Sequence, residues 1–417
     1  MRPVCLFVFA LCSSVAFGVR AEERKNSVSL SLEAALARAE EKSPIVRRAK
    51  GNLRVAESAR VGAGLAMPTN PLLSFALGRR ADRSSSAPAA EGFEWGLHLE
   101  QSFEIGGQRS ARLSEAERGV DVAHAQARLA VAEARAEVRG AYVGSQLFRS
   151  QVETAKKREE LAGRVLESAR AKMGAGAASD VDVNLAESER GRAEHDRIEA
   201  EIDAAGEDEM LRLLLDFPED TGLELTTPLG FPPLADDVRR LVEAAKKRRQ
   251  DLRALRATES QLDAALTRYR REAIPNPTLF GDVSQAQPGQ TFLGGGASMA
   301  VPVFRRNQGQ IATLSAEKAR IEDERRIADR EVTLEVVRLH RALAQRRDEA
   351  RVFAEDVVPA AEENLSLVTD GWHAGKFDLF RVVQAAREAG EARRRQLEVM
   401  AALWQVAIDL DRATGAP

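Results

Sequence analysis

Cysteine, aromatic residues and long apolar runs are scarce in this sequence of 417 residues, and each shortage excludes a class of protein. The two cysteines, Cys5 and Cys12, lie within the first 21 residues, so the rest of the chain forms no disulfide. Aromatic residues make up 5% of the chain and charged residues 30%, which favours long solvated helices over a large globular core. The net charge of −3 offers no basic excess for nucleic acid, so we expect no nucleic-acid partner.

Residues 1–21 have the pattern of a secretory signal peptide. Arg2 supplies the charged start, the segment from Val4 to Val19 is mostly apolar, and small residues allow cleavage after Gly18 or Ala21. A membrane anchor is the alternative, but the apolar run is shorter than the roughly 20 residues that a spanning helix needs. A lipid-attachment site has a small residue just before its cysteine. Cys12 is preceded by Leu11, so lipidation is not expected. No later run is apolar enough for a membrane helix, so insertion into a membrane would require strands.

Proline is absent from Gln108 to Lys172, a stretch rich in Ala, Arg and Glu. These residues lose little conformational entropy on entering a helix. As one rod the stretch would run roughly 98 Å at about 1.5 Å per residue. A rod of this length needs neighbours to pack on. A second stretch, 307–370, has the same character, but Pro359 should kink it.

Two short strand-like segments precede each rod. They cover about 72–78 and 93–103 before the first rod, and about 278–284 and 292–301 before the second. The segment 93–103 alternates, so that apolar and polar side chains should lie on opposite faces. The apolar set is Phe93, Trp95, Leu97, Leu99 and Phe103; the polar set is Glu94, His98, Glu100, Ser102 and Glu104. This pattern fits a half-buried soluble sheet or a transmembrane barrel with a polar lumen.

Each rod ends at a glycine-marked break and is followed by a shorter helix, which predicts two antiparallel helical hairpins at 108–215 and 307–412. A helix is expected from Leu30 to Glu41, with Ser31 as its N-cap. Ser179 or Asp180 should cap the first return helix, and Asp378 the second. The order of elements repeats after about 200 residues, which is too long for a solenoid unit. We therefore expect two intertwined structural repeats in one domain, 22–221 and 222–417.

Enzyme chemistry is not indicated by any motif. The five histidines lack metal-ligand spacing, and no nucleophile triad or phosphate loop is present, so we predict no catalytic residues, no metal site and no cofactor.

Several motifs together resemble the outer-membrane efflux factors typified by TolC. They are Pro275-Asn276-Pro277 before a strand, Val301-Pro302-Val303-Phe304 followed by Asn307-Gln308-Gly309-Gln310-Ile311, and the glycine-ended rods. The run from Glu100 to Arg109 is similar to the branch that serves cobalt–zinc–cadmium exporters. The resemblance covers nearly the whole chain after residue 21.

The resemblance implies a mainly helical fold with a small β part and a Gram-negative outer-membrane location. Three protomers would each give four strands to a shared 12-stranded barrel in outer-membrane lipid, which an α-helical tunnel continues into the periplasm. The expected function is a passive exit duct, of heavy-metal cations, for an inner-membrane pump of the RND type reached through a periplasmic adaptor. Four strands cannot close a barrel alone, which agrees with pooling between copies.

The resemblance also assigns roles to the turns between the long helices. The adaptor-contacting tips would be Gly174, Gly176, Gly375 and Lys376, and the residues of a periplasmic gate would be Asp180, Asp182, Asp378, Arg381 and Gln384. The second turn departs from the acidic pattern of the family, because Arg381 stands where the first turn has Asp182. The three aspartates could equally be helix caps.

Two alternatives remain at this point. A duct of the same fold could serve type I secretion or drug efflux, and a secreted coiled-coil structural protein could use the same helices without a membrane.

Overall fold

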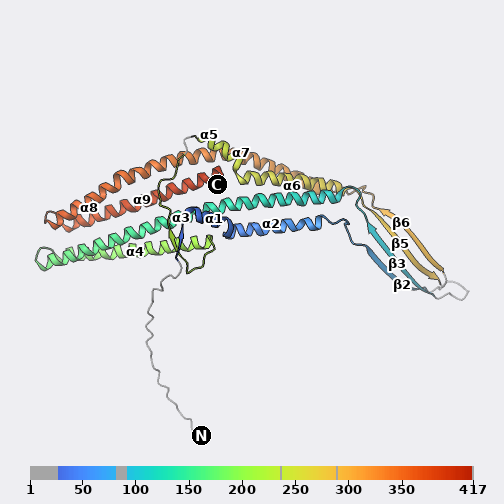
Figure 1. The fold of residues 1–417 in the computed structure, drawn as a ribbon, viewed down its shortest axis with the longest axis horizontal. Helices are drawn as coiled ribbons and strands as arrows, with labels where there is room; N and C mark the ends of the chain where they lie inside the picture. The colour runs from blue at the N-terminus through green and yellow to red at the C-terminus, as the bar shows by residue number, and fades with distance from the viewer. Residues whose placement is uncertain (1–26, 81–91, 235–236, 288–289, 416–417) are drawn as a thin grey trace, which may run out of the picture.

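The computed structural model describes residues 27–80, 92–234, 237–287 and 290–415. The expected signal peptide and both cysteines lie outside the described residues. The described part of the molecule is elongated: long helices lie side by side along one axis, and a four-stranded sheet lies at one end of them (Figure 1). Its helices all fall short, in length or in apolar character, of what a membrane crossing requires.

The chain follows one pattern of elements twice. Two helices, two strands and a long helical hairpin succeed one another in each half. The first half contains α1 (Leu32–Lys42), α2 (Pro44–Ala63), β2 (Leu72–Arg80), β3 (Gly92–Ser102), α3 (Gln108–Gly174) and α4 (Asp180–Leu214). The second half contains α5 (Val238–Arg248), α6 (Gln250–Glu272), β5 (Pro277–Gln287), β6 (Gln290–Met299), α7 (Gln308–Val352), α8 (Val358–His373) and α9 (Leu379–Thr414). The predicted strands and hairpins are confirmed, with ends shifted by a few residues.

The N-terminal boundary of α1 differs from the prediction. Ser31 caps the helix as expected, since its hydroxyl accepts a hydrogen bond from the Ala34 N–H at 3.1 Å. Leu30, however, belongs to a short strand, β1 (Ser27–Leu30), which pairs in parallel with β4 (Gly222–Leu225). A four-residue strand carries too little alternation to be read from sequence, and its stability comes from a partner about 195 residues away.

The second rod is interrupted where Pro359 predicted a kink. α7 ends at Val352, a π-helical turn covers Phe353–Val357, and α8 carries Pro359 in its first turn. Proline has no N–H and its ring clashes with the carbonyl four residues earlier, so the helix widens just before it. The rod is therefore divided into three consecutive helical segments, with the irregular turn directly before Pro359 as the kink prediction requires.

Three apolar clusters hold the helices together. One joins α5, α6, α7 and α9, with Leu403 and Val336 at its centre. Another joins α1, the middle of α3, the end of α4 and the β1–β4 pair, where the Tyr142 hydroxyl donates to the Leu30 carbonyl at 2.9 Å. The last lies near the turns of both hairpins. The first two clusters thus each hold the elements of one half together, and the last joins apolar side chains of both hairpins.

The four-stranded sheet is antiparallel, in the order β2-β3-β5-β6. Leu73, Leu99 and Gly281 are opposite one another across three strands, as are Ser74, His98 and Asp282, so residues of one parity share a face. One face is apolar and exposed; it carries Leu73, Phe75, Leu77, Phe93, Leu97, Leu99, Leu279 and Leu293. The opposite face carries His98, Glu100 and Asp282. The predicted separation of apolar and polar side chains is confirmed for β3.

Candidate functional site

The two hairpin turns have the same backbone geometry. In the first, Gly176 adopts a φ of +73°, its N–H donates to the Met173 carbonyl at 2.9 Å, and the Ala177 N–H donates to the Lys172 carbonyl at 2.7 Å. In the second, Gly375 has a φ of +74°, with hydrogen bonds to Trp372 at 3.0 Å and from Lys376 to Gly371 at 2.8 Å. This pair of bonds satisfies the last carbonyls of a helix, and the left-handed residue is glycine because a Cβ is disfavoured there.

The chemistry of the two turns differs. The first turn exposes a surface of small residues, Gly174, Ala175, Gly176 and Ala177. The second turn exposes Lys376 and Phe377, and Phe377 packs over Gly371, where a Cβ would come within 2.3 Å of the ring. The four predicted tip residues thus all lie at the exposed turns of the hairpins.

The predicted gate residues cluster just after each turn, and several are occupied by local bonds. Asp182 completes a capping box: its carboxylate accepts from the Ser179 N–H at 2.8 Å and the Ser179 hydroxyl at 2.7 Å. These hydrogen bonds hold the pKa of Asp182 below its ordinary value. Asp378 caps α9 by accepting from the Arg381 N–H at 3.0 Å. The expected caps Ser179 and Asp378 are confirmed.

The other gate candidates have different surroundings. Asp180 is exposed at the first residue of α4, Arg381 lies 5.3 Å from the Phe377 ring centroid, and Gln384 donates to Glu388 at 3.1 Å. Charges of both signs therefore surround the turns, with the carboxylates concentrated at the first.

The two turns are tied to each other by one side chain. Lys172 donates from Nζ to the Trp372 carbonyl at 2.7 Å, and the same nitrogen lies 4.0 Å from the Trp372 ring centroid. Trp372 is buried against Leu379, Val382 and Val383 in the cluster near the turns. Trp372 therefore packs between helices of the two hairpins.

Further from the turns, a buried carboxylate joins the hairpins. Glu189 on α4 is 5% exposed and accepts from Arg158 of α3 at 3.0 Å and from Arg387 of α9 at 2.9 and 2.7 Å. Burial alone would raise the pKa of Glu189, but the bonds from Arg387 and Arg158 outweigh it and the pKa is lowered. Sequence analysis missed this cluster, because its charges look like any solvated helix face.

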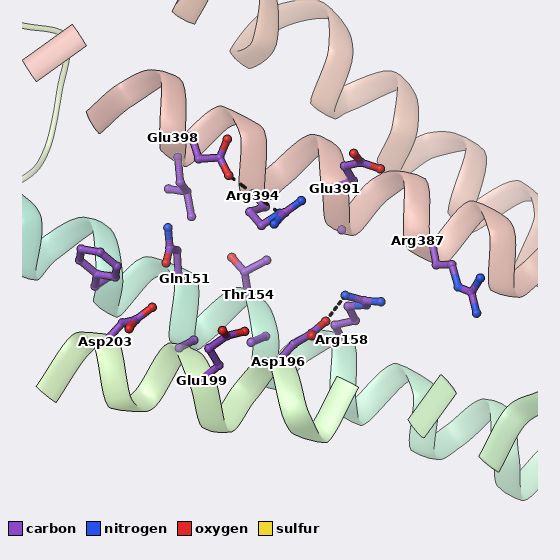
Figure 2. Close-up of a pocket in the computed structure, with 15 residues that line it drawn as sticks. Gln151, Thr154, Arg158, Asp196, Glu199, Asp203, Arg387, Glu391, Arg394 and Glu398 are labelled. Carbon is purple, nitrogen blue, oxygen red and sulfur yellow. Dashed lines mark hydrogen bonds and ion pairs between the residues drawn. The ribbon is translucent and has the colours of Figure 1, made fainter. Parts of the chain in front are cut away.

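A groove of about 630 Å³ opens beside this cluster, between the α3–α4 hairpin and α9. Figure 2 shows Arg158, Asp196 and Glu199 on one side and Arg387, Glu391 and Arg394 on the other. Arg158 pairs with Asp196, and Gly390 leaves room for the Arg158 chain. Both signs of charge line the groove, and neither a nucleophile with its base nor, among the described residues, a cluster able to hold a metal ion is present.

The polar face of the sheet has its own short network. His98 Nδ1 lies 2.6 Å from Asp282 on the neighbouring strand, and its Nε2 lies 3.4 Å from Glu100. The contact with Asp282 crosses from β3 to β5, and so links a strand of the first half to one of the second, whereas Glu100 lies on β3 with His98.

Comparison with known proteins gives one family. The profile described as "Outer membrane efflux protein" matches residues 35–215. A curated relative, the cobalt-zinc-cadmium resistance protein CzcC of Cupriavidus metallidurans, is 26% identical over 317 residues, which are 75% of each chain.

Solved structures show the same fold. The outer-membrane channel OprN superposes with a TM-score of 0.74 at 15% identity, covering 93% of this chain and 90% of that one. The outer membrane protein VceC of Vibrio cholerae gives 0.72 at 15% identity, covering 92% and 96%. At these identities the likeness establishes the arrangement of helices and strands.

Proposed function

Because this chain belongs to the outer membrane efflux protein family, we propose that three copies of it form the exit duct of a tripartite pump for heavy-metal cations. The protein is an outer-membrane efflux channel component and not an enzyme. Channels of this family work with a periplasmic adaptor and an inner-membrane pump, here expected to be of the RND type. The secreted coiled-coil scaffold is set aside, because it has no place in this family.

The open sheet is the observation that carries the proposal. Its strands are 9, 11, 11 and 10 residues long, close to the roughly 9–11 that cross a bilayer as tilted strands. One face exposes large apolar side chains that water does not favour, Phe75 and Leu293 among them. Strands β2 and β6 are unpaired at the outer edges, a state that proteins avoid.

Copies of the chain can satisfy both edges. The sheet has an even number of antiparallel strands, so β2 and β6 run in opposite directions. β6 of one copy and β2 of the next would therefore pair antiparallel, as a closed barrel requires. Three copies give twelve strands, with His98, Glu100 and Asp282 facing the water-filled inside and the two repeats, 22–221 and 222–417, contributing equally.

The proposed cargo rests on the curated relative CzcC and on the sequence motif that resembles the cobalt–zinc–cadmium branch of the family. CzcC is named as a cobalt-zinc-cadmium resistance protein, and the run from Glu100 to Arg109 resembles the same branch. We assign divalent cations as the cargo on this basis. Type I secretion and drug efflux use ducts of the same fold and are the competing assignments.

The hairpin turns are assigned to the adaptor and to the gate. Gly174 and Gly176 at the first turn, and Gly375 and Lys376 at the second, would meet the adaptor, because small side chains let another helix approach closely. The periplasmic gate would be formed by residues just after the two turns. These are Asp180 and Asp182 after the first turn, and Asp378, Arg381 and Gln384 after the second.

Deletion of the gene tests the cargo. The strain should become more sensitive to zinc, cobalt and cadmium salts, and the wild-type gene on a plasmid should restore growth. Unchanged metal tolerance together with new drug sensitivity would transfer the duct to drug efflux. Membrane fractionation of the wild-type protein, with a trimer that dissociates only on heating, tests the assembly separately.

A matched pair of glycines tests the tips. Gly174 at the first turn and Gly191 on α4 are both exposed, and a Cβ added at either meets nothing within 4 Å. Gly174→Gln should abolish metal tolerance and crosslinking to the adaptor while the protein remains in the outer membrane. Gly191→Gln should behave as wild type. Equal tolerance in both variants would remove the first turn from the contact with the adaptor.

A further inference from the structure

The connections between the sheet and the helices all lie at one level of the molecule. Gln108, at the start of α3, donates to the Ile274 carbonyl at 2.9 Å and to Asn276 at 3.0 Å. Arg109 donates to the Gly64 carbonyl at 2.9 Å, and Asn307 to the Tyr269 carbonyl at 3.0 Å. The ends of α2 and α6 and the starts of α3 and α7 are thereby held together beside the sheet (Figure 1).

Six exposed arginines gather at this level, and we call them the junction arginines: Arg60, Arg109, Arg270, Arg271, Arg305 and Arg306. None of them forms an ion pair with a described residue. The neighbouring carboxylates are already engaged, since Glu104 pairs with Arg112, and Glu115 and Glu272 pair with Arg268 at 2.9 and 3.6 Å. Glu57, one turn before Arg60, is the remaining one. The junction therefore carries a positive excess in a protein whose net charge is −3.

Large apolar side chains are exposed at the same level. Phe304, 86% exposed, directly precedes Arg305 and Arg306, and Val301, 75% exposed, lies three residues before Phe304. Ile105 and Val303 are exposed beside them. They continue the apolar face of the sheet up to the arginines, so the surface changes from apolar to cationic within a few residues. This is the order of chemistry met on passing from the hydrocarbon of a bilayer to its headgroups.

We propose that the junction arginines bind the phosphate headgroups of anionic phospholipids in the leaflet on the helical side of the membrane. The guanidinium group is planar and presents two parallel N–H donors to a phosphate, whereas an ammonium group acts as a point charge. All six cations are arginines, whose fork of donors suits bidentate contact with a phosphate. The inference rests on the proposed position of the sheet in the membrane.

A lipid titration of the purified full-length protein in detergent tests the inference. Bound lipid is counted by native mass spectrometry with phosphatidylglycerol, with phosphatidylcholine and with inorganic phosphate as competitor. Phosphatidylglycerol should bind the wild-type protein at least tenfold more tightly than phosphatidylcholine. Inorganic phosphate at the same concentration should not displace it, because the apolar residues contribute only with a lipid.

Two matched fourfold variants locate the site. Replacing Arg270, Arg271, Arg305 and Arg306 with Gln should weaken phosphatidylglycerol binding at least tenfold. Replacing four exposed cations of α5 and α6 should leave binding within twofold; these are Arg239, Lys246, Lys247 and Arg256. Both variants lose the same charge, and unchanged oligomer size and melting temperature without lipid show that both are folded.

Several results would overturn the inference. Equal binding of the two lipids, or undiminished binding to the junction variant, would remove the headgroup site. Displacement by inorganic phosphate would reduce it to a site for a bare anion. Unchanged lipid binding with altered ion selectivity of the reconstituted protein would place the arginines on the duct. Wild-type protein that does not float with liposomes would instead refute the membrane position of the sheet itself.

Discussion

Glu189 is the buried carboxylate that joins the two helical hairpins, and Glu189→Gln should loosen their ends. The carboxylate accepts three hydrogen bonds from Arg158 and Arg387, and Arg192 lies 3.9 Å away. Breaking a fully buried ion pair costs about 3–5 kcal/mol, because the remaining charge stays unpaired. Arg158 and Arg387 are partly exposed and regain water, so we expect a smaller loss than this range, about 2 kcal/mol.

Hydrogen exchange of the purified protein measures this loss where it occurs. A cost of about 2 kcal/mol corresponds to a roughly 30-fold larger open population, so amides around Glu189 and Arg387 should exchange roughly 30-fold faster. Those around Leu403, in the separate cluster with α5, α6 and α7, should not change. A nearby control is Glu187→Gln, since Glu187 forms an exposed pair with Arg170 that is worth at most about 1 kcal/mol.

The pH dependence follows from the sign of the pKa shift. The folded pKa of Glu189 lies below the ordinary value of 4.5, so its contribution to stability is present above that value and is lost as the pH falls through the folded pKa. The wild type should therefore approach the Gln variant in exchange rate only below about pH 4.5. Identical exchange in wild type and Glu189→Gln at pH 7, or no coupling between Glu189→Gln and Arg387→Gln in a double-mutant cycle, would refute the reasoning.

Three further changes test the packing and the turns. Leu403→Ala should cost about 2–5 kcal/mol in chemical denaturation, because the side chain is fully buried among four helices; a loss below 1 kcal/mol would contradict that packing. Gly375→Ala should cost about 1–2 kcal/mol of local stability, measured by exchange at the second turn, because its φ is +74°; equal protection would contradict the left-handed geometry. Asp378→Ala should cost about 0.5–2 kcal/mol by loss of the α9 cap, and Asp378→Ser should restore most of it, which an acidic gate alone would not explain.

Local patterns in the sequence predicted local structure well. The alternation from Phe93 to Phe103 identified β3 and both of its faces, since a strand's side chains alternate whatever its partner. The caps Ser31, Ser179 and Asp378 were predictable because each bonds to a backbone N–H three residues later. The same holds for Pro359, whose effect on the preceding turn is steric.

Contacts between distant segments were not predictable from those patterns. Glu189 and Arg387 are 198 residues apart, and Lys172 and Trp372 are 200 apart. Each pair depends on how far one hairpin is displaced along the other, and a shift by one turn, about 5.4 Å, would give every residue a new neighbour. The doubled element order offered one signal, because both separations are close to the repeat length of about 200 residues. Residues at equivalent positions of the two halves therefore meet across the hairpins.

That near-equivalence also explains why the two turns share a backbone and differ in surface. The hydrogen bonds that end α3 and α8 require only a left-handed residue at Gly176 and Gly375, and they place no demand on the side chains next to it. The first turn could therefore become a surface of small residues while the second acquired Lys376 and Phe377. In the proposed trimer both kinds of turn would be present in three copies. If the proposed adaptor meets both turns, it contacts a surface of small residues at one and Lys376 with Phe377 at the other, so we expect the two contacts to differ in strength.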